Sequence, residues 1–152
     1  MKKTLGIAAL AATLALLGAA PMMGARTTPL IVTPSQLQWT TAPDLPAGAK
    51  MAVVDGDPSK VEHYTVRLML PDGATFPPHY HGGDEMVTVL QGSIVVGLGD
   101  TIDLAKSQTL PAGSYVFLPA GVHHWARAKG DAVLQLSGMG PMTQTNVKPG
   151  SM

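Results

Sequence analysis

The sequence predicts an all-β domain, an antiparallel sandwich or barrel. Short apolar segments alternate with turn-forming residues along a chain of 152 residues that holds 17 Gly and 13 Pro. Beyond the first 25 residues, no stretch repeats its apolar positions with the 3.6-residue period of a helix. Hydrophobic residues make up 45% of the chain, which argues against disorder.

The expected strands follow one another in chain order, each ended by a turn. After a Pro/Gly loop over residues 40–50, they are residues 51–54, 64–70, 86–90, 93–98, 113–118, 123–128 and 132–137, with a candidate short strand at 143–147. The alternation is clearest in Tyr64–Leu70, where Val66 and Leu68 share one face. Arg67 and Met69 share the other face, and an exterior position is the more common one for an arginine, although an inward position stays open.

The first 25 residues differ from the rest and predict a cleaved secretory signal peptide. A basic start precedes an apolar run over Leu5–Ala20, and small residues cluster over Gly18–Ala25. Cleavage after Ala25 is favoured over cleavage after Ala20, because Pro21 would directly follow the latter. A permanent membrane anchor is the alternative, but the run is slightly shorter than the roughly 20 apolar residues of a spanning helix.

Charge and composition exclude several classes of function. Residues 26–152 carry eight basic and ten acidic side chains, a net charge of −2, so they lack the basic footprint of a nucleic-acid binder. The absence of Cys excludes a disulfide framework, a Cys-based zinc site, an iron–sulfur cluster and a thiol nucleophile. We expect a periplasmic or secreted protein with no nucleic-acid partner and no stable membrane anchor after processing.

Histidines supply the clearest sign of chemistry. His79 and His81 lie two residues apart and therefore share one side of an extended strand. Glu85 follows the turn at residues 82–84, so its carboxylate can return to that side, and His124 begins a later strand. Three imidazoles and one carboxylate suit a divalent transition metal such as Fe, Mn, Ni, Cu or Zn. Burial of this quartet without an ion would cost several kcal/mol, so the sequence predicts a metal site.

These residues stand in a longer pattern. The two stretches that resemble the conserved motifs of the cupin superfamily are Gly73-x5-His79-x-His81-x3-Glu85-x6-Gly92 and Gly113-x5-Pro119-x-Gly121-x2-His124. One position departs from the family pattern. The family usually has an Asn after the second-motif His and three intervening residues, and this chain has Ala128 at that position. That Asn is not a metal ligand in the family, so the departure affects a turn or a packing contact. Residues 52–60, 76–79 and 138–141 are also similar to small exported single-domain cupins.

The resemblance covers residues 33–148 and implies a double-stranded β-helix, a jelly-roll barrel whose two motifs line one mouth. An arm at residues 26–32 would precede this domain and a tail at residues 149–152 would follow it. The resemblance implies that the metal ligands are His79, His81, Glu85 and His124. It also makes Glu85 the candidate general base, since Glu62 is the only other glutamate. A barrel that has lost its metal is the alternative, and a homodimer is expected because relatives commonly dimerise.

Two classes of function stay open. A metal on three His and one Glu leaves one or two positions for substrate or O₂, as in a metal-dependent dioxygenase or isomerase acting on a small molecule. The alternative is a non-catalytic metal or small-ligand binding or sensor module of the periplasm. An open cavity beside the ligands favours the enzyme, whereas a sealed site favours the binder.

Neighbouring side chains are expected to have other roles. His123 and Tyr80 alternate with the ligands along their strands, so they point the opposite way. His63 is expected on the surface, Trp125 in core packing and Asp84 in a turn.

Overall fold

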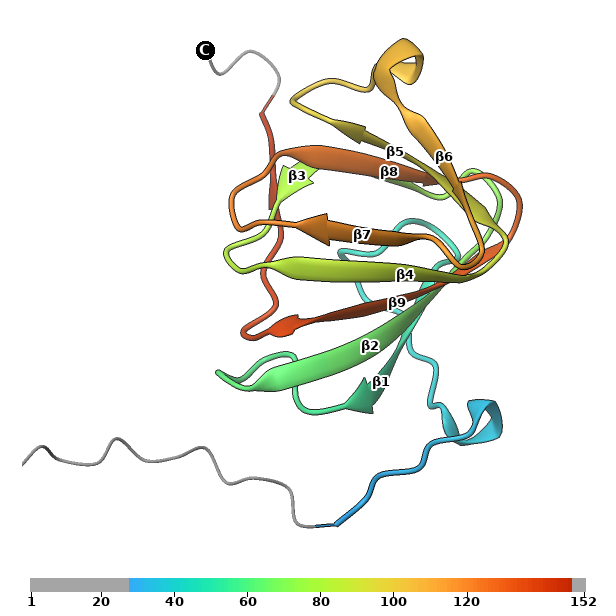
Figure 1. The fold of residues 1–152 in the computed structure, drawn as a ribbon, viewed down its shortest axis with the longest axis vertical. Helices are drawn as coiled ribbons and strands as arrows, with labels where there is room; N and C mark the ends of the chain where they lie inside the picture. Colours follow the sequence, from blue (N-terminus) through green and yellow to red (C-terminus); the bar gives the residue numbers. More distant parts are fainter. Residues whose placement is uncertain (1–27, 149–152) are drawn as a thin grey trace, which may run out of the picture.

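The computed structural model describes residues 28–148, which form two facing antiparallel β-sheets (Figure 1). The predicted signal peptide at residues 1–25 and the predicted tail at residues 149–152 lie outside the described residues. The helical elements of the described part are two single-turn 3-10 helices, η1 (Pro34–Gln36) and η2 (Leu104–Lys106). Between residues 28 and 148, no helix has the length and apolar character needed to cross a membrane.

The chain passes repeatedly from one sheet to the other. The first sheet has the order β1 (Lys50–Asp55), β2 (His63–Leu70), β9 (Ala132–Met139), β4 (Glu85–Gln91) and β7 (Tyr115–Leu118). The second has the order β10 (Thr145–Asn146), β3 (Thr75–Tyr80), β8 (His124–Ala128), β5 (Ser93–Leu98) and β6 (Gln108–Pro111). From β2 onward only β5 and β6 are consecutive strands of the same sheet, which is the connectivity of a jelly roll. The predicted all-β jelly-roll fold is confirmed.

The strand predictions are confirmed for β1, β2, β4, β5, β7, β8 and β9, with ends that differ by a few residues. β10 occupies two residues of the candidate strand at 143–147. β6 was not predicted, and for β3 an extended strand was expected only around His79 and His81. β3 contains Pro77 and Pro78, which lack the N–H that a strand donates, and its pairing with β8 shifts register between Phe76 and His79. β6 is a short, largely polar edge strand that ends in a proline.

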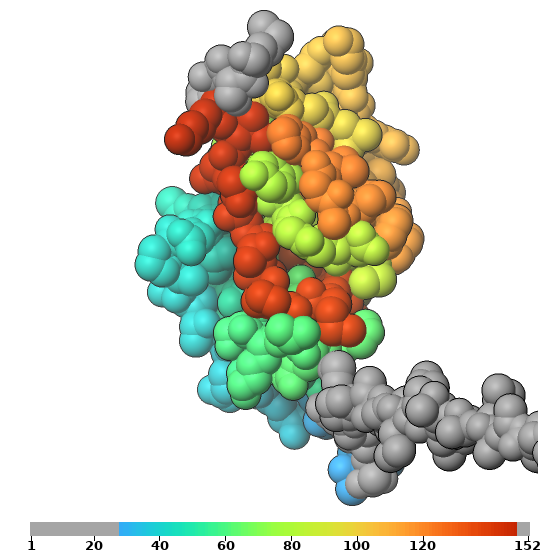
Figure 2. All heavy atoms as spheres, turned by 90° about the vertical axis from the view of Figure 1, so that its left-hand side faces the viewer, coloured from blue at the N-terminus to red at the C-terminus, as the bar shows by residue number. Residues whose placement is uncertain are grey.

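The C-terminal segment, residues 141–147, crosses one end of the barrel. Figure 2 shows it in red, running over this end beside the yellow-green chain around residue 80. The Met142 amide donates to the Pro58 carbonyl (2.6 Å), the Val147 amide donates to the Pro78 carbonyl (2.8 Å), and β10 pairs with β3 in between. The segment is therefore held at both of its ends over the barrel mouth.

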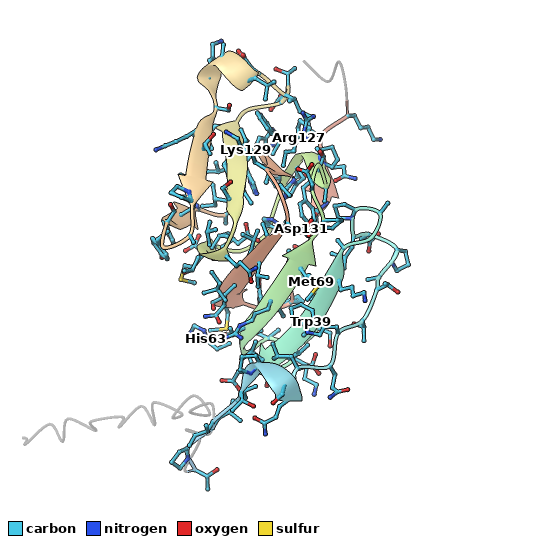
Figure 3. All side chains as sticks on the ribbon, turned by 90° about the vertical axis from the view of Figure 1, so that its right-hand side faces the viewer. Trp39, His63, Met69, Arg127, Lys129 and Asp131 are labelled. Atoms are coloured by element: carbon cyan, nitrogen blue, oxygen red, sulfur yellow. The ribbon has the colours of Figure 1, made fainter. Side chains whose placement is uncertain are left out.

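The hydrophobic core fills the space between the sheets. The alternation predicted for β2 is confirmed, because Val66 and Leu68 are buried in this core. Arg67 lies on the outer face, where its Nε donates to Gln135 Oε1 (3.2 Å). Met69 is 39% exposed on the same face, and Figure 3 labels it there. The inward position left open for Arg67 and Met69 is thus excluded.

Trp125 is a core residue, as predicted, and is completely buried. It pairs with Gly97 of the adjacent strand β5. A Cβ atom at residue 97 would lie 2.5 Å from the indole Nε1, so only a glycine leaves room for the ring.

Candidate metal centre

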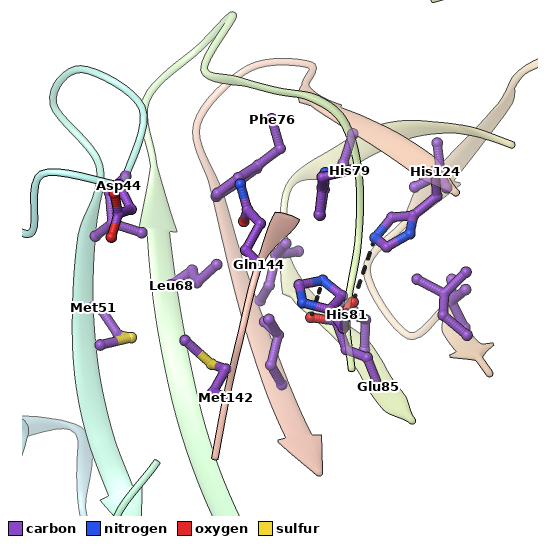
Figure 4. Close-up of a pocket in the computed structure, with 18 of the residues that line it drawn as sticks. Asp44, Met51, Leu68, Phe76, His79, His81, Glu85, His124, Met142 and Gln144 are labelled. Atoms are coloured by element: carbon purple, nitrogen blue, oxygen red, sulfur yellow. Dashed lines mark ion pairs between the residues drawn. The ribbon is translucent and has the colours of Figure 1, made fainter. Parts of the chain in front are cut away.

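The structure brings all four predicted ligands together at one end of the barrel (Figure 4). His79 is on β3 and pairs directly with His124, the first residue of β8. His81 follows β3, and Glu85 begins β4 in the facing sheet. The side chains of His79, Glu85 and His124 are buried, with exposed fractions of 3%, 5% and 4%.

Two hydrogen bonds join the loops that carry these side chains. The Asp84 carboxylate accepts a hydrogen bond from the Ala120 amide (2.9 Å), and the Gly121 amide donates to the His81 carbonyl (2.9 Å). The loop between β3 and β4 is therefore bonded to the loop that precedes His124. Asp84 lies in a turn, as predicted, but it also connects the two halves of the site.

The distances between the donor atoms are close to those found around a single ion. One ring nitrogen from each of His79, His81 and His124 lies within 4.8 Å of the other two. The carboxylate of Glu85 places Oε1 at 3.5 Å from His81 Nε2 and Oε2 at 3.6 Å from His124 Nε2. An ion bonded at about 2.0–2.2 Å separates its ligand atoms by up to about 4.4 Å. The three imidazoles therefore need only a small inward movement to share an ion, and the Glu85 carboxylate lies beside two of them.

Hydrogen bonds fix the tautomer of every histidine in the cluster. The Nδ1 atoms bond to backbone carbonyls: His79 to Pro77 (2.7 Å), His81 to Thr143 (2.6 Å) and His124 to Val122 (3.0 Å). A carbonyl oxygen only accepts, so the proton of each neutral ring is on Nδ1 and each Nε2 presents a lone pair. The Nε2 of His81 is buried and has no hydrogen-bond partner anywhere in residues 28–148. A metal ion would supply this missing partner.

Burial sets the charge states of the cluster. It lowers the pKa of His79 to about 4, and it also lowers the pKa of His124, so both rings are held in the neutral form that binds metals. Burial raises the pKa of Glu85, because the carboxylate loses its contact with water. A divalent cation would offset that loss. The donor set and the unpartnered nitrogen therefore fit a divalent transition metal.

A cavity of about 240 Å³ lies beside the cluster. Its walls are mainly apolar, and Leu68 and Phe76 belong to them (Figure 4). The C-terminal segment contributes Met142 and Gln144, and the loop before β1 contributes Asp44. The sequence did not single out these last three residues. The only signal for Gln144 was the candidate strand at 143–147, and the sequence did not show where that strand would lie.

The neighbours of the ligands behave as predicted. His123 points away from the cluster, where its Nδ1 lies 2.6 Å from Asp100 Oδ1. Its ring stacks on that of Tyr80, with centroids 4.9 Å apart and planes 18° apart. His63 is exposed on the surface (Figure 3). Ala128, where the family pattern has Asn, is buried at the opposite end of β8 from His124, so this departure does not touch the site.

The fold and the site define a jelly-roll barrel with a histidine cluster in its mouth. Residues 66–137 match the family model of the cupin domain. These residues form a cupin domain, as the motif resemblance indicated.

Comparison with individual proteins supports this fold. A 66-residue stretch is 36% identical to germin-like protein 5-1 of Oryza sativa subsp. japonica, and it covers 43% of this chain and 30% of that protein. Less than a third of the curated relative is therefore matched. Among solved structures, a candidate acetylacetone dioxygenase from Methylibium petroleiphilum superposes with a TM-score of 0.65 at 19% identity, covering 86% of this chain and 89% of the other. The polyketide cyclase RemF of Streptomyces resistomycificus gives 0.65 at 16% identity, with 82% and 89% covered. At these identities the structures share the fold.

Proposed function

We propose that this chain is a metal-dependent cupin enzyme, a dioxygenase or an isomerase that acts on a small molecule. The ligands of its single divalent ion are His79, His81, Glu85 and His124. The observation that carries the proposal is the cavity of about 240 Å³ beside three lone-pair-bearing imidazoles. A site that only stores an ion needs no such space, whereas a substrate does.

The side chains of the site have distinct tasks in this proposal. The bound ion supplies Lewis acidity or redox contact with O₂. The three carbonyl-bonded rings hold their Nε2 atoms in place, and the apolar walls keep water from the substrate. The Glu85 carboxylate lines the cavity, so it lies within reach of a substrate proton and is the candidate general base.

A non-catalytic binding or sensor module is the second candidate. It is favoured by the small number of proton-transfer groups in the cavity. Apart from the histidines, Glu85 and Asp44 are the only acids or bases among the described residues that line it, and Asp44 lies at the exposed rim. An enzyme with this site would therefore have Glu85, and Asp44 at the rim, as its carboxylates for proton transfer.

Export and dimerisation complete the proposal. The basic start, apolar run and small residues of positions 1–25 support removal of a leader and a periplasmic or secreted location. Exposed apolar side chains on the outer face of the first sheet support a homodimer; they include Met69, Tyr115, Phe117 and Met139.

The first test is metal content. Protein purified from the periplasm without added ions is expected to contain about one equivalent of a transition metal by elemental analysis. The His81→Ala variant is expected to lose at least nine-tenths of the bound metal, because one metal ligand is removed. Its melting temperature is also expected to fall, because the hydrogen bond to the Thr143 carbonyl is lost together with the metal. His63→Ala, a histidine on the exposed surface, is the matched control and is expected to keep the metal. Equal metal content in the two variants would remove His81 from the site.

The second test is turnover. Consumption of O₂, or isomerisation followed by NMR, is measured with a panel of diketones, phenols and small acids. Glu85→Gln protein that still holds metal but has lost turnover would support the base role. If the metal-loaded wild-type protein turns over none of these compounds, the result would favour the second candidate, a non-catalytic binding or sensor module.

A further inference from the structure

The charges of the cavity restrict what can bind in it. Among residues 28–148, no lysine or arginine lines the cavity. The residues on its wall that can carry a negative charge are Glu85, at the histidine cluster, and Asp44, on the opposite side (Figure 4). The described residues therefore place no cationic side chain beside a bound molecule, and the metal ion would be the main positive charge near it.

The charges of the ion and its protein ligands favour a bound molecule that carries one negative charge. The Nδ1 atoms of the three imidazoles bond to backbone carbonyls, so each ring would bind a metal in its neutral form through Nε2. A divalent ion held by these rings and the Glu85 carboxylate would leave a site with a net charge of +1. A molecule that binds with one negative charge makes the site neutral. A molecule with two negative charges leaves an excess charge among apolar side chains, and the burial of an unbalanced charge is strongly unfavourable.

The shape and polarity of the cavity restrict the rest of the molecule. Its volume of about 240 Å³ is below the roughly 300–1,000 Å³ of pockets that hold drug-sized ligands. The wall away from the metal ligands is formed by aliphatic and aromatic side chains such as Leu68, Phe76, Val87, Ile94 and Leu136. Four protein ligands would leave two positions free on a six-coordinate ion, and two oxygens of one small molecule could bind there.

Resting on the proposed function, we propose that the cavity selects a small apolar molecule that binds the ion through two oxygens and carries a single negative charge. The enolate of a 1,3-diketone is an example of this class. Dicarboxylates and phosphorylated compounds are excluded by the same charge balance.

Acetylacetone and malonate form a matched pair of probes. Both present two oxygens in a 1,3 arrangement on skeletons of the same size, but malonate carries charged oxygens where acetylacetone carries methyl groups. The protein is loaded with Zn²⁺, which has no redox chemistry, so that binding is measured without turnover. Affinities are determined by calorimetry and divided by the affinity of each probe for aqueous Zn²⁺.

The corrected affinity is expected to favour acetylacetone over malonate by at least tenfold. A corrected ratio near one, a preference for malonate, or no binding of either probe to the zinc-loaded protein would overturn the inference. Metal content is measured on the same sample. Failure to hold zinc refutes the proposed function, whereas full zinc occupancy with a preference for malonate refutes only the inference about charge.

A charge added at the mouth provides the second arm. Gln144 is exposed, lines the cavity from the C-terminal segment, and donates its amide to Asn146 Oδ1 (3.0 Å). Gln144→Arg supplies the missing cation and is expected to improve malonate binding at least threefold relative to acetylacetone. Gln144→Met, which is of similar size and uncharged, is expected to leave the ratio unchanged. An equal effect of both variants on the ratio would show that wall charge does not select the ligand and would overturn the inference.

Discussion

Replacement of Glu85 by Gln is expected to stabilise the metal-free chain while weakening its hold on metal. Glu85 is 5% exposed, and its carboxylate oxygens lie 3.5 Å from His81 Nε2 and 3.6 Å from His124 Nε2. Both nitrogens carry lone pairs, because the ring protons are on the Nδ1 atoms. Without an ion the carboxylate is thus buried beside acceptors, and a neutral amide avoids that cost.

The pH dependence distinguishes this effect from general stabilisation. Burial raises the pKa of Glu85 above its ordinary 4.5, so its contribution is complete below pH 4.5 and is lost as the pH rises through the folded-state pKa. Burial lowers the pKa of His79 from 6.5 to about 4, so its contribution is complete above pH 6.5 and is lost as the pH falls toward 4. Between pH 4.5 and 6.5, a rise in pH therefore lowers the contribution of Glu85 to the free energy of unfolding and raises that of His79 in the wild type. In the Glu85→Gln variant only the contribution of His79 remains of these two, so the free energy of unfolding of this variant rises more steeply with pH than that of the wild type.

The size of the effect follows from the cost of a buried group without a partner, about 1–3 kcal/mol. For a domain of about 120 residues, 1 kcal/mol corresponds to about 4 °C in melting temperature, so the gain at pH 8 is about 4–12 °C. Thermal unfolding is followed by circular dichroism from pH 5 to pH 8 in the presence of a chelator, and then with the native metal. With metal the order is expected to reverse, because one ligand is missing and the affinity falls at least tenfold.

Glu62→Gln is the control, since it removes the only other glutamate at a position outside the cluster. It is expected to shift the melting temperature by no more than about 2 °C under any of these conditions. A metal-free Glu85→Gln protein that melts below the wild type at pH 8 would refute the reasoning. The carboxylate would then have a hydrogen-bond donor in the folded chain.

Two further substitutions test how the barrel supports the site. Gly97→Ala places a Cβ atom 2.5 Å from Trp125 Nε1, so we expect the free energy of unfolding to fall by about 1–3 kcal/mol and the tryptophan fluorescence to shift. Leu98→Ala, at a position that is 66% exposed, is the control and is expected to change the free energy of unfolding by no more than about 0.5 kcal/mol. Unchanged stability of Gly97→Ala would contradict the packing. Asp84→Ala removes the acceptor of the Ala120 amide, so we expect a loss of about 0.5–1.5 kcal/mol in urea unfolding and a weaker metal affinity in competition with a chelator. Wild-type values in both measurements would show that the bond between the two loops does not support the site.

The sequence predicted the strands whose burial pattern is local. β2 shows this best, since its side chains alternate strictly between the core and the surface and are bounded by turn residues. β3 could not be found in this way, because its two prolines argue against a strand. It is a strand because β8 pairs with it on one side and β10 on the other, and the latter comes from the far end of the chain.

The four candidate ligands could be predicted for a similar reason. The two-residue spacing of His79 and His81 and the short turn before Glu85 determine their common direction locally. His124 was included as the histidine that begins a later strand, and the resemblance to the second family motif supported it, but no local rule places it beside His79. The bond between His81 Nδ1 and the Thr143 carbonyl joins residues 62 positions apart, and no pattern within either stretch specifies it.

The C-terminal segment links metal affinity to ligand choice. The Thr143 carbonyl holds the His81 ring, while its neighbours Met142 and Gln144 form part of the cavity wall. A backbone shift in this segment would therefore alter a metal ligand and the wall together. Side-chain changes at Gln144 leave the Thr143 carbonyl in place, because the segment is held by the backbone bonds of Met142 and Val147. For this reason the mouth of the cavity can change its preference for a ligand by side-chain substitution, whereas a deletion in the segment would remove selectivity and metal together.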